Sequence, residues 1–420
     1  MSFASSPRRP HAGHPLAPRS PNDASAGAGR ANRLAASALA ALTLAAVLLG
    51  GCVDAAPIAG PARYAGPTLR TDLPPAGARG MTVLTRNLAV GADLTPFASA
   101  PAAQVPFLAA QTWATVQASN FPARAQALAR EIAETRPHLV GLQEVEIVRT
   151  QLPGDAAFGG TIPAATVIYD FLALLLDELA ARGLGYVPVA VQQNFESELP
   201  AFVSFDPLTF LDVRLTDRDV ILARADVPVA NSAGANFTAA LPVSVAGTTL
   251  LFLRGWTSVE ATVGGMTFRF VNTHLEAEGD AFQAAQAAEL LAVLADEPLP
   301  VVLVGDFNSA ADGSGTPTYE LIASAGYTDA WSESHARAAG YTCCQAADLR
   351  NAVSTLSERI DIIFVRDGFA SGSVGILGGV HVDVLGEMPG DRTASGLWPS
   401  DHAGVAATLH LPAAVATAHP

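Results

Sequence analysis

Residues 301–309 read VVLVGDFNS, and this stretch decides the fold. Its four leading apolar residues predict a strand that is buried on both faces, as in α/β proteins. Gly305 ends the run, and in an extended chain Asp306 and Asn308 would then point to the same side. They could serve as turn and cap residues, the commonest use of both types, or belong to a site at the strand end. The rest of the chain has to decide between these alternatives.

The composition excludes several classes of protein. The chain has 420 residues, half of them hydrophobic, which is enough for one large domain or two ordinary ones. All 24 basic residues are arginines, so a phosphate-binding loop with an obligatory lysine is excluded. The net charge of −15 argues against a general nucleic-acid binder, because an acidic surface repels polyanions. It still allows a metal-filled cleft.

The three cysteines are too few for a disulfide framework or a structural zinc site. Cys343 and Cys344 are adjacent and are either a vicinal disulfide in an oxidising compartment or two small loop residues. We favour the disulfide.

The N-terminal region has the features of an exported protein. Residues 1–33 lack periodic apolar residues and are predicted to be disordered. The uncharged run 34–49 is shorter than a membrane span of roughly 20 residues and fits the core of a signal peptide. It ends in LGGC at residues 49–52, which resembles the bacterial lipoprotein cleavage motif, with Cys52 as the lipidated first residue of the mature protein. The alternative is an ordinary secretory signal with an incidental cysteine.

Apolar periodicity predicts the elements of one folded domain. Helices are expected over 104–119, 121–135 and 280–296, and in a further helix that carries Ile168, Phe171, Leu172, Leu175 and Leu179 on one stripe. Gly264-Gly265 predicts a hairpin turn. Strands are expected over 81–88, 138–143, 187–192, 220–224, 243–253, 258–263, 267–271, 301–304, 359–365 and 404–411.

Isolated polar residues recur at the ends of these strands or within them. Each one has an ordinary explanation, such as a solvated strand end or a core histidine bonded to backbone. Their coincidence is harder to explain, because buried carboxylates are costly unless they are paired or bound to metal. The residues are Asn87, Glu144, Asn272, His274, Asp306, Asn308, Asp361, Asp401 and His402.

The residue types predict a particular chemistry. Carboxylate and asparagine oxygens suit Mg²⁺, with Mn²⁺ or Ca²⁺ as alternatives. Histidines with carboxylate partners can exchange protons with a substrate. The chain has no Gly-x-Ser-x-Gly elbow and no Cys–His nucleophile motif. Together these features favour metal-assisted hydrolysis of a phosphate ester.

The ordered set of motifs resembles the endonuclease/exonuclease/phosphatase superfamily, which has the deoxyribonuclease-I-like fold. The resemblance covers residues 80–411 and implies an α/β four-layer sandwich of two mixed β-sheets flanked by helices. The implied domains are a signal-bearing extension (1–51), a tether (52–79), a catalytic domain (80–413) and a tail (414–420). The motifs are TRNL (85–88), LQEV (142–145), NTHL (272–275), GDFN (305–308), RID (359–361) and SDH (400–402).

The resemblance also implies roles for the metal and water side of the site. Glu144 would be the main Mg²⁺ ligand, with Asn87 beside it and Asp401 supporting the metal. Asp306 would orient or deprotonate the attacking water, and Asn308 would hold the phosphate.

On the phosphate side, His402 would contact the scissile phosphate and be oriented by Asp361. His274 would stabilise or protonate the leaving oxygen, with Asp217 or Asp219 as its candidate partner. Asn272 and Arg218 would contact the substrate phosphate. The chain departs from the family pattern at His138, where an Asp is frequent, and we interpret His138 as structural.

The leading hypothesis is a monomeric, Mg²⁺-dependent phosphodiesterase or phosphatase, anchored through Cys52 outside the cytoplasm in a bacterial cell envelope. Its substrate would be a small-molecule, lipid or nucleotide phosphate ester, chosen by loops such as 95–120, 150–165, 225–240 and 310–350. Nucleic acid is not favoured. The alternatives are a secreted nuclease and a catalytically silent surface lipoprotein, although the metal and proton-transfer positions are all retained.

We expect the mature chain to begin at a lipidated Cys52, because the apolar run ends there and a Pro- and Gly-rich stretch follows. Intact-mass measurement and metabolic acyl labelling, with Cys52→Ser as the control, check this. A freely soluble, unmodified chain that starts elsewhere would contradict it.

Overall fold

The computed structural model describes residues 80–335, 337–366 and 380–410. The predicted signal region, Cys52, the tether and the tail lie outside these residues. Among the described residues, no helix is long and apolar enough to cross a membrane.

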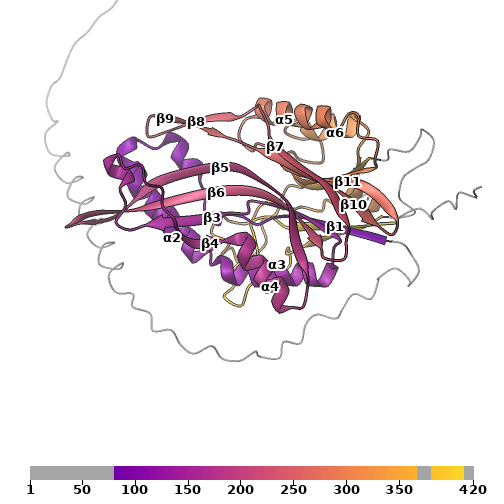
Figure 1. Ribbon diagram of the computed structural model, residues 1–420, viewed down its shortest axis with the longest axis horizontal. Coiled ribbons are helices and arrows are strands. Elements are labelled where there is room, and N and C mark those ends of the chain that lie inside the picture. Colours follow the sequence, from indigo (N-terminus) through magenta and orange to yellow (C-terminus); the bar gives the residue numbers. More distant parts are fainter. Residues whose placement is uncertain (1–79, 336, 367–379, 411–420) are drawn as a thin grey trace, which may run out of the picture. The chain divides into compact units, whose positions relative to one another are not determined.

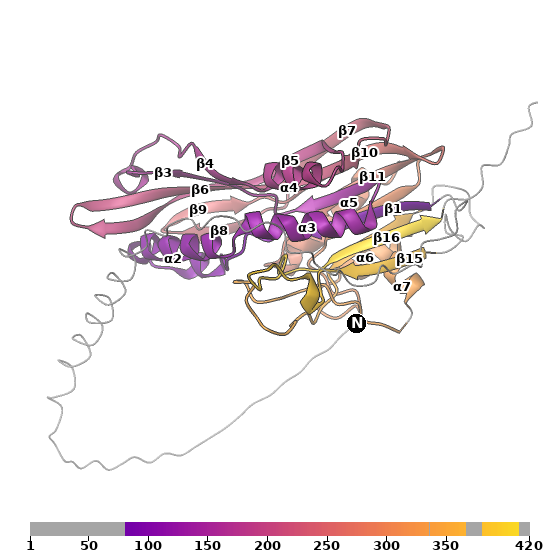
Figure 2. The same ribbon diagram turned by 90° about the horizontal axis from the view of Figure 1, so that it is seen from below.

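Two mixed sheets pack face to face, with helices on their outer faces (Figures 1 and 2). In the first sheet the strand order is β15-β16-β1-β2-β6-β3-β4, and β5 pairs with β6. It comprises β1 (Gly80–Asn87), β2 (Leu139–Gln143), β3 (Ile147–Gln151), β4 (Thr166–Asp170), β5 (Tyr186–Phe205), β6 (Leu208–Arg224), β15 (Val380–Leu385) and β16 (Gly404–His410).

In the second sheet the order is β13-β14-β12-β11-β10-β7, and a separate hairpin is formed by β8 (Leu241–Val245) and β9 (Thr248–Phe252). The strands of the second sheet are β7 (Val229–Asn236), β10 (Gly255–Val263), β11 (Met266–His274), β12 (Val301–Asp306), β13 (Thr328–Asp329) and β14 (Asp361–Arg366). The helices are α2 (Val105–Ala118), α3 (Phe121–Thr135), α4 (Phe171–Ala181), α5 (Asp280–Val293), α6 (Thr318–Ser324) and α7 (Ala330–Ser334).

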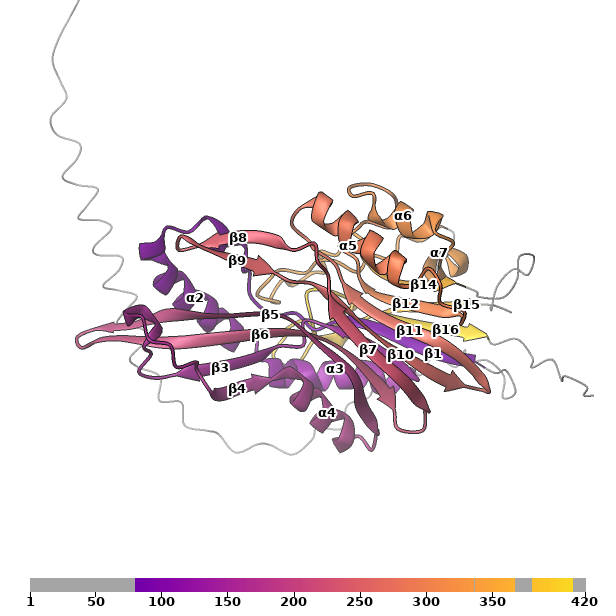
Figure 3. The same cartoon turned by 45° about the horizontal axis from the view of Figure 1, so that its top comes forward.

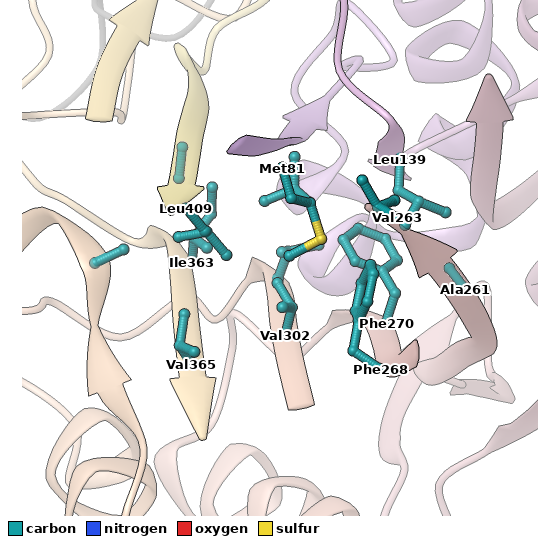
Figure 4. Packing of buried hydrophobic residues seen from close by; sticks show 14 of the residues in the cluster. Met81, Leu139, Ala261, Val263, Phe268, Phe270, Val302, Ile363, Val365 and Leu409 are labelled. Carbon is teal, nitrogen blue, oxygen red and sulfur yellow. The ribbon is translucent and has the colours of Figure 1, made fainter. Parts of the chain in front are cut away.

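Three apolar layers account for the four-layer sandwich. The central layer lies between the sheets, where Met81 of β1 meets Val302 of β12 and Phe270 of β11 (Figure 4). A second layer joins α3 and α4 to the first sheet, and a third joins α5 and α6 to the second. The architecture implied by the resemblance is confirmed.

The sequence explains α3 and its packing. Asn120 caps the helix by accepting a hydrogen bond from the Ala123 amide, and Leu128 and Ile132 are buried on the face that meets the sheet. At the start of the helix, Phe121 stacks on Phe171 of α4 with ring centroids 3.5 Å apart. The helix predicted over 121–135 is confirmed, as are α2 and α5 within a few residues of their predicted ends.

Two predicted elements are wrong. Ile168 belongs to strand β4 and is 41% exposed, so the helical stripe begins only at Phe171. Residues 243–253 do not form one strand, because Ala246 and Gly247 both have positive φ and turn the chain into the β8–β9 hairpin.

Two further differences concern strand extent. β5 and β6 form a far longer hairpin than predicted, since their middle parts are rich in polar residues that hide the strand pattern. Strand β15 was not predicted. The Gly264-Gly265 turn is confirmed between β10 and β11, and Cys343 and Cys344 are joined in a vicinal disulfide.

Phe270→Ala should lower the free energy of unfolding by about 3–5 kcal/mol, because it leaves a cavity in the layer between the sheets. Phe205→Ala is the matched control, since Phe205 is 74% exposed and its loss should change the free energy by less than about 0.5 kcal/mol. Denaturant unfolding monitored by circular dichroism measures both, and equal effects would contradict the packing described here.

Candidate active site

Three strands of the second sheet place their polar residues side by side. In the strand register His274 of β11 lies opposite Asp306 of β12, which lies opposite Asp361 of β14. Gly305 makes this close pairing possible, because a Cβ at that position would overlap the carbonyl oxygen of Thr273. The pattern of apolar strands ending in polar residues therefore has a geometric origin in the pairing of β11, β12 and β14.

Asp306 lies at the centre of the site and is 1% exposed. Its Oδ2 accepts a hydrogen bond from Asn87 Nδ2 (3.1 Å) across the sandwich, and its Oδ1 accepts one from the Asn308 amide (3.0 Å). The second bond is the ordinary turn use of an aspartate, so both alternatives considered for this residue hold. Burial, and to a lesser degree the charge of Asp361, raise the pKa of Asp306 to about 7, although the neighbouring His402 opposes the shift.

His402 is held as a cation between two carboxylates. Its Nδ1 donates to Asp361 Oδ2 at 2.8 Å and lies 3.7 Å from Asp306 Oδ2. Burial alone would lower the pKa of His402, but the charges of Asp361 and Asp306 outweigh it and raise the pKa well above its usual value. The ring is oriented by Asp361, as the resemblance implied.

The segment before β16 fixes the position of this histidine. Ser400 Oγ donates to the Asn87 carbonyl oxygen (2.8 Å) and accepts from the His402 amide (3.1 Å). Arg86 also donates to the His402 carbonyl oxygen.

Glu144 follows β2 and adopts a left-handed backbone conformation, with φ of 52°. Its Oε1 accepts from Asn87 Nδ2 (3.1 Å) and its Oε2 from the Val90 amide (3.0 Å). Burial and then repulsion from Asp401 raise the pKa of Glu144. Glu144 and Asp401 are thus two carboxylates that repel each other, and their oxygens are ligands that fit a divalent cation.

A second group could also hold a metal. One ligand atom from each of Asp306, Asp361 and His402 lies within 4.8 Å of the others. The hydrogen bond from His402 to Asp361 already satisfies part of this group, while Asp361 Oδ1 has no hydrogen-bond partner among the described residues. We therefore favour the Glu144 side, where the carboxylates repel each other.

His274 has a partner that sequence reasoning missed. Arg254 Nη1 donates to His274 Nδ1 at 3.1 Å, so Nδ1 is an acceptor and the ring proton is on Nε2. Nε2 lies 3.6 Å from Asp306 Oδ2 and 3.2 Å from Asn308 Nδ2, which donates to the Leu275 carbonyl oxygen (2.9 Å). Burial, followed by the charges of Arg254 and His402, lowers the pKa of His274 well below its usual value. The lowered pKa favours the neutral ring of His274, which can donate a hydrogen bond from Nε2.

The predicted carboxylate partners of His274 are wrong. The side chains of Asp217 and Asp219 instead accept hydrogen bonds from Asn194 Nδ2 (3.4 and 2.8 Å). Arg254 directly precedes Gly255, which lies opposite His274 in the β10–β11 hairpin. Counting outward from the Gly264-Gly265 turn could have placed Arg254 next to the residue opposite His274, but not the direction of its side chain.

Two predicted phosphate contacts also need correction. Asn272 is fully buried. Its Oδ1 accepts a hydrogen bond from Gln143 Nε2 (2.6 Å) and its Nδ2 donates to the Leu142 carbonyl oxygen (3.0 Å), so Asn272 joins the two sheets behind the site. Arg218 points to the Val145 carbonyl oxygen (2.9 Å) and Asp170 (2.7 Å). His138 accepts from the Thr82 amide at 3.0 Å, in keeping with a structural role.

A cleft of about 750 Å³ opens onto these residues. Among the described residues that line it, Arg254 is the only arginine. The predicted site residues on its wall are Glu144, His274, Asp306, Asn308, Asp401 and His402.

Comparisons with known proteins identify a family. The model of a family described as "Endonuclease/Exonuclease/phosphatase family" matches residues 114–402. No curated protein sequence matches the chain.

Solved structures show partial similarity at low identity. A family protein from Bacteroides thetaiotaomicron has 15% identity and a TM-score of 0.48, covering 80% of this chain and 100% of its own. Truncated TDP2 from Caenorhabditis elegans has 17% identity and a TM-score of 0.45, covering 79% and 98%. The mannosyl-6-phosphatase Bt3783 of Bacteroides thetaiotaomicron has 17% identity and a TM-score of 0.45, covering 78% and 98%.

We expect His274 to stay neutral with its proton on Nε2 between pH 6 and 8, and Arg254→Gln to raise the pKa of its ring, because a neighbouring positive charge is removed. Histidine ¹⁵N NMR titration reports both the tautomer and the pKa. Arg269→Gln, on the same strand as His274 but paired with Glu260 and Glu297, is the control. A proton on Nδ1 in the wild type would contradict the assignment.

Proposed function

The chain belongs to the endonuclease/exonuclease/phosphatase family, and from this premise we propose that it is a metal-dependent hydrolase of phosphate esters. The observation that carries the proposal is the position of Asp306. It is a buried carboxylate with a pKa of about 7, lying between a cationic histidine and a neutral one at the wall of a cleft. A base and two donors around one point are what attack of water on a phosphate requires.

The side chains divide the proton transfers among them. Asp306 accepts the proton of the attacking water, and a pKa close to the working pH suits that task. His402, held by Asp361, places positive charge beside the phosphoryl oxygens. His274 donates a hydrogen bond from Nε2 to the oxygen of the leaving group. Arg254 donates to His274 Nδ1, which therefore stays unprotonated.

Glu144 and Asp401 would hold the metal, with the Asn87 amide ordering Glu144. A divalent cation there, Mg²⁺ being the first candidate, would neutralise charge that develops on the phosphate. The Asn87 amide also contacts Asp306, so the metal side and the base side share one residue.

A small or membrane-borne phosphate ester fits this protein better than long duplex DNA. Enzymes that track DNA need several cationic contacts to phosphates, whereas this chain has a net charge of −15 and no lysine. We also propose that Cys52 anchors the protein in a bacterial cell envelope. This is supported by the LGGC sequence at residues 49–52 and by the Pro- and Gly-rich stretch that follows.

A panel of DNA, RNA, phospholipid and phosphomonoester substrates, assayed with and without Mg²⁺ at equal ionic strength, tests the proposal. Hydrolysis of an ester that needs the metal supports it. Cleavage of DNA faster than every lipid and small ester would favour a nuclease, and no hydrolysis in any assay would favour the silent binding protein.

Asp306→Asn should reduce turnover by about 10²–10⁴-fold while the protein remains folded, because the amide cannot accept the proton of water. Steady-state kinetics on the best substrate and thermal unfolding measure the two effects. Asp312→Asn is the matched control, since Asp312 lies on the exposed loop after the same strand. Near wild-type turnover of Asp306→Asn would show that another group is the base.

The pH profile gives a second readout of the same prediction. The base works only when ionised, and the pKa of Asp306 is raised to about 7, so activity should be full above this pH. Below it, kcat/KM should fall by about tenfold per pH unit as the carboxyl becomes protonated. A profile that stays flat from about pH 5 to 8 would contradict the assignment.

Glu144→Gln should mainly weaken metal binding, because one of the two repelling carboxylates loses its charge. Isothermal titration calorimetry with Mg²⁺ measures the affinity, and excess metal should restore part of the activity. Glu320→Gln, at an exposed position on α6, is the control. Unchanged Mg²⁺ affinity in Glu144→Gln would move the metal to another group of ligands.

A further inference from the structure

The cleft extends well beyond the residues that perform chemistry. Its far part is walled by α2, by the short helix η1 (Thr95–Ser99), by the β8–β9 hairpin and by the β5–β6 hairpin. Figure 3 shows α2, β8 and β9 at the same end of the molecule as the turn that joins β5 and β6. We call this part the apolar chamber, defined by Phe97, Trp113, Leu199, Val243, Leu250 and Phe252.

Most of the walls of the apolar chamber, including Phe97, Leu199 and Leu250, belong to a hydrophobic cluster that is separate from the three layers of the sandwich. Phe97 and Val245 are buried in this cluster, while Val243 and Leu250 pack against it and remain partly exposed. Phe252 stacks on Phe195 with ring centroids 4.0 Å apart, and both rings line the cleft. The elements are thus packed together, and the space they leave is lined by hydrocarbon.

The apolar chamber is continuous with the catalytic residues. The same cleft that Phe97 and Leu250 line is also lined by Asp306 and His402. A molecule with its phosphorus at Asp306 would therefore have the rest of its length directed to apolar walls. Such walls in water are unfavourable, and a ligand that covers them gains free energy in proportion to the apolar area removed from water.

The charged residues of the cleft disfavour other kinds of ligand. Besides the site residues, Glu146, Asp217 and Glu276 line the cleft, and among the described lining residues Arg254 is the only arginine that opposes them. A second phosphate or a nucleic-acid strand would meet more negative than positive charge. The walls of the apolar chamber also carry Thr95, Thr112 and Ser197, but apolar side chains outnumber them, and a hydrocarbon chain covers such walls without needing hydrogen bonds.

We propose that the substrate is an amphiphilic phosphate ester whose hydrocarbon chain occupies the apolar chamber while its phosphate lies in the cleft beside Asp306 and His402. The inference rests on the proposed function and names the substrate class of the same site. The cleft volume of about 750 Å³ is in the usual range for sites that enclose most of a small ligand.

A series of p-nitrophenyl alkyl phosphodiesters, from methyl to octyl, tests the proposal on the full chain with Mg²⁺. kcat/KM should rise by up to about fourfold per methylene group, since each buried methylene adds a constant increment of binding free energy. Hydrolysis of the methyl ester with no rise along the series would overturn the substrate class and leave the proposed function intact. No hydrolysis of any ester, with or without metal, would instead overturn the proposed function.

Two neighbouring leucines of β9 provide a matched pair of variants. Leu250 lines the apolar chamber, whereas Leu251 points away and is 55% exposed. Leu250→Gln should reduce the octyl-to-methyl ratio of kcat/KM by at least about tenfold, and Leu251→Gln should leave the ratio as in the wild type. Equal ratios in both variants would overturn the proposal.

Competitive inhibition gives a readout that does not depend on turnover. Octyl phosphate should inhibit hydrolysis of the methyl ester at far lower concentration than methyl phosphate does, and Ala109→Phe, which fills the apolar chamber from α2, should remove the difference. Equal inhibition by the two phosphates in the wild type would overturn the proposal.

The same assays distinguish two sources of the chain. Dispersed octyl ester below its micelle concentration represents a free amphiphile, and vesicles of a zwitterionic diacyl phospholipid represent a membrane. If the enzyme hydrolyses the vesicle lipid and Leu250→Gln slows that hydrolysis, the substrate is a membrane lipid. If chain length matters only for the dispersed esters, the substrate is a free amphiphile. The absence of both effects would overturn the substrate class.

Discussion

The burial of the Asp306 carboxylate is the constraint on which the rest of the site depends. A carboxylate that is 1% exposed is costly to ionise unless neighbouring groups bond to it. Asn87 supplies one bond from the other sheet, the Asn308 amide supplies a second, and His402 supplies a positive charge nearby. These partners lower the pKa of Asp306 by less than burial raises it, so the pKa remains at about 7. Burial of the charge in this way gives the carboxylate a pKa that suits the base proposed for this site.

The site also requires that the strand ends of the two sheets keep a fixed position relative to each other. Buried polar bonds near the site accomplish this. Asn272 of the second sheet bonds Gln143 of the first. On the side of the first sheet, Arg86, paired with Glu131 of α3, bonds the carbonyl oxygen of His402 and so fixes the segment that precedes β16. Each of these groups is buried, so breaking any of the bonds would leave an unsatisfied polar atom and cost more than the bond itself contributes. The same feature makes these residues rigid supports rather than substrate contacts, because their bonding capacity is already used within the protein.

Charge and shape then restrict what the cleft can accept. The end of the cleft that carries Asp306 is strongly acidic except for Arg254 and the histidines, and the far end is apolar. The proposed substrate matches this division, with a phosphate and a metal at the first end and hydrocarbon at the second. Arg254 has a double effect in this arrangement. It opposes the acids at the junction, and it fixes the tautomer of His274 from the side away from Asp306. The polar and apolar ends of the cleft are thus separated by a charged boundary.

Strand composition alone was enough to identify β1, β2, β11, β12 and β14, and their terminal polar residues marked most of the site, because a buried strand leaves a short, recognisable apolar run. The sequence also determined the helix α3 and the hairpin turn at Gly264-Gly265 through local periodicity and turn chemistry. Only the tertiary structure showed that Arg254 faces His274 and that Asn272 faces inward, since a side chain at a strand end can turn toward either neighbour.

The apolar chamber could not be predicted from the sequence either, because apolar residues that line a cavity and apolar residues that fill a core have the same pattern along the chain. What separates them is whether another side chain occupies the facing space, and that is decided only when distant elements such as α2, β6 and β9 pack together.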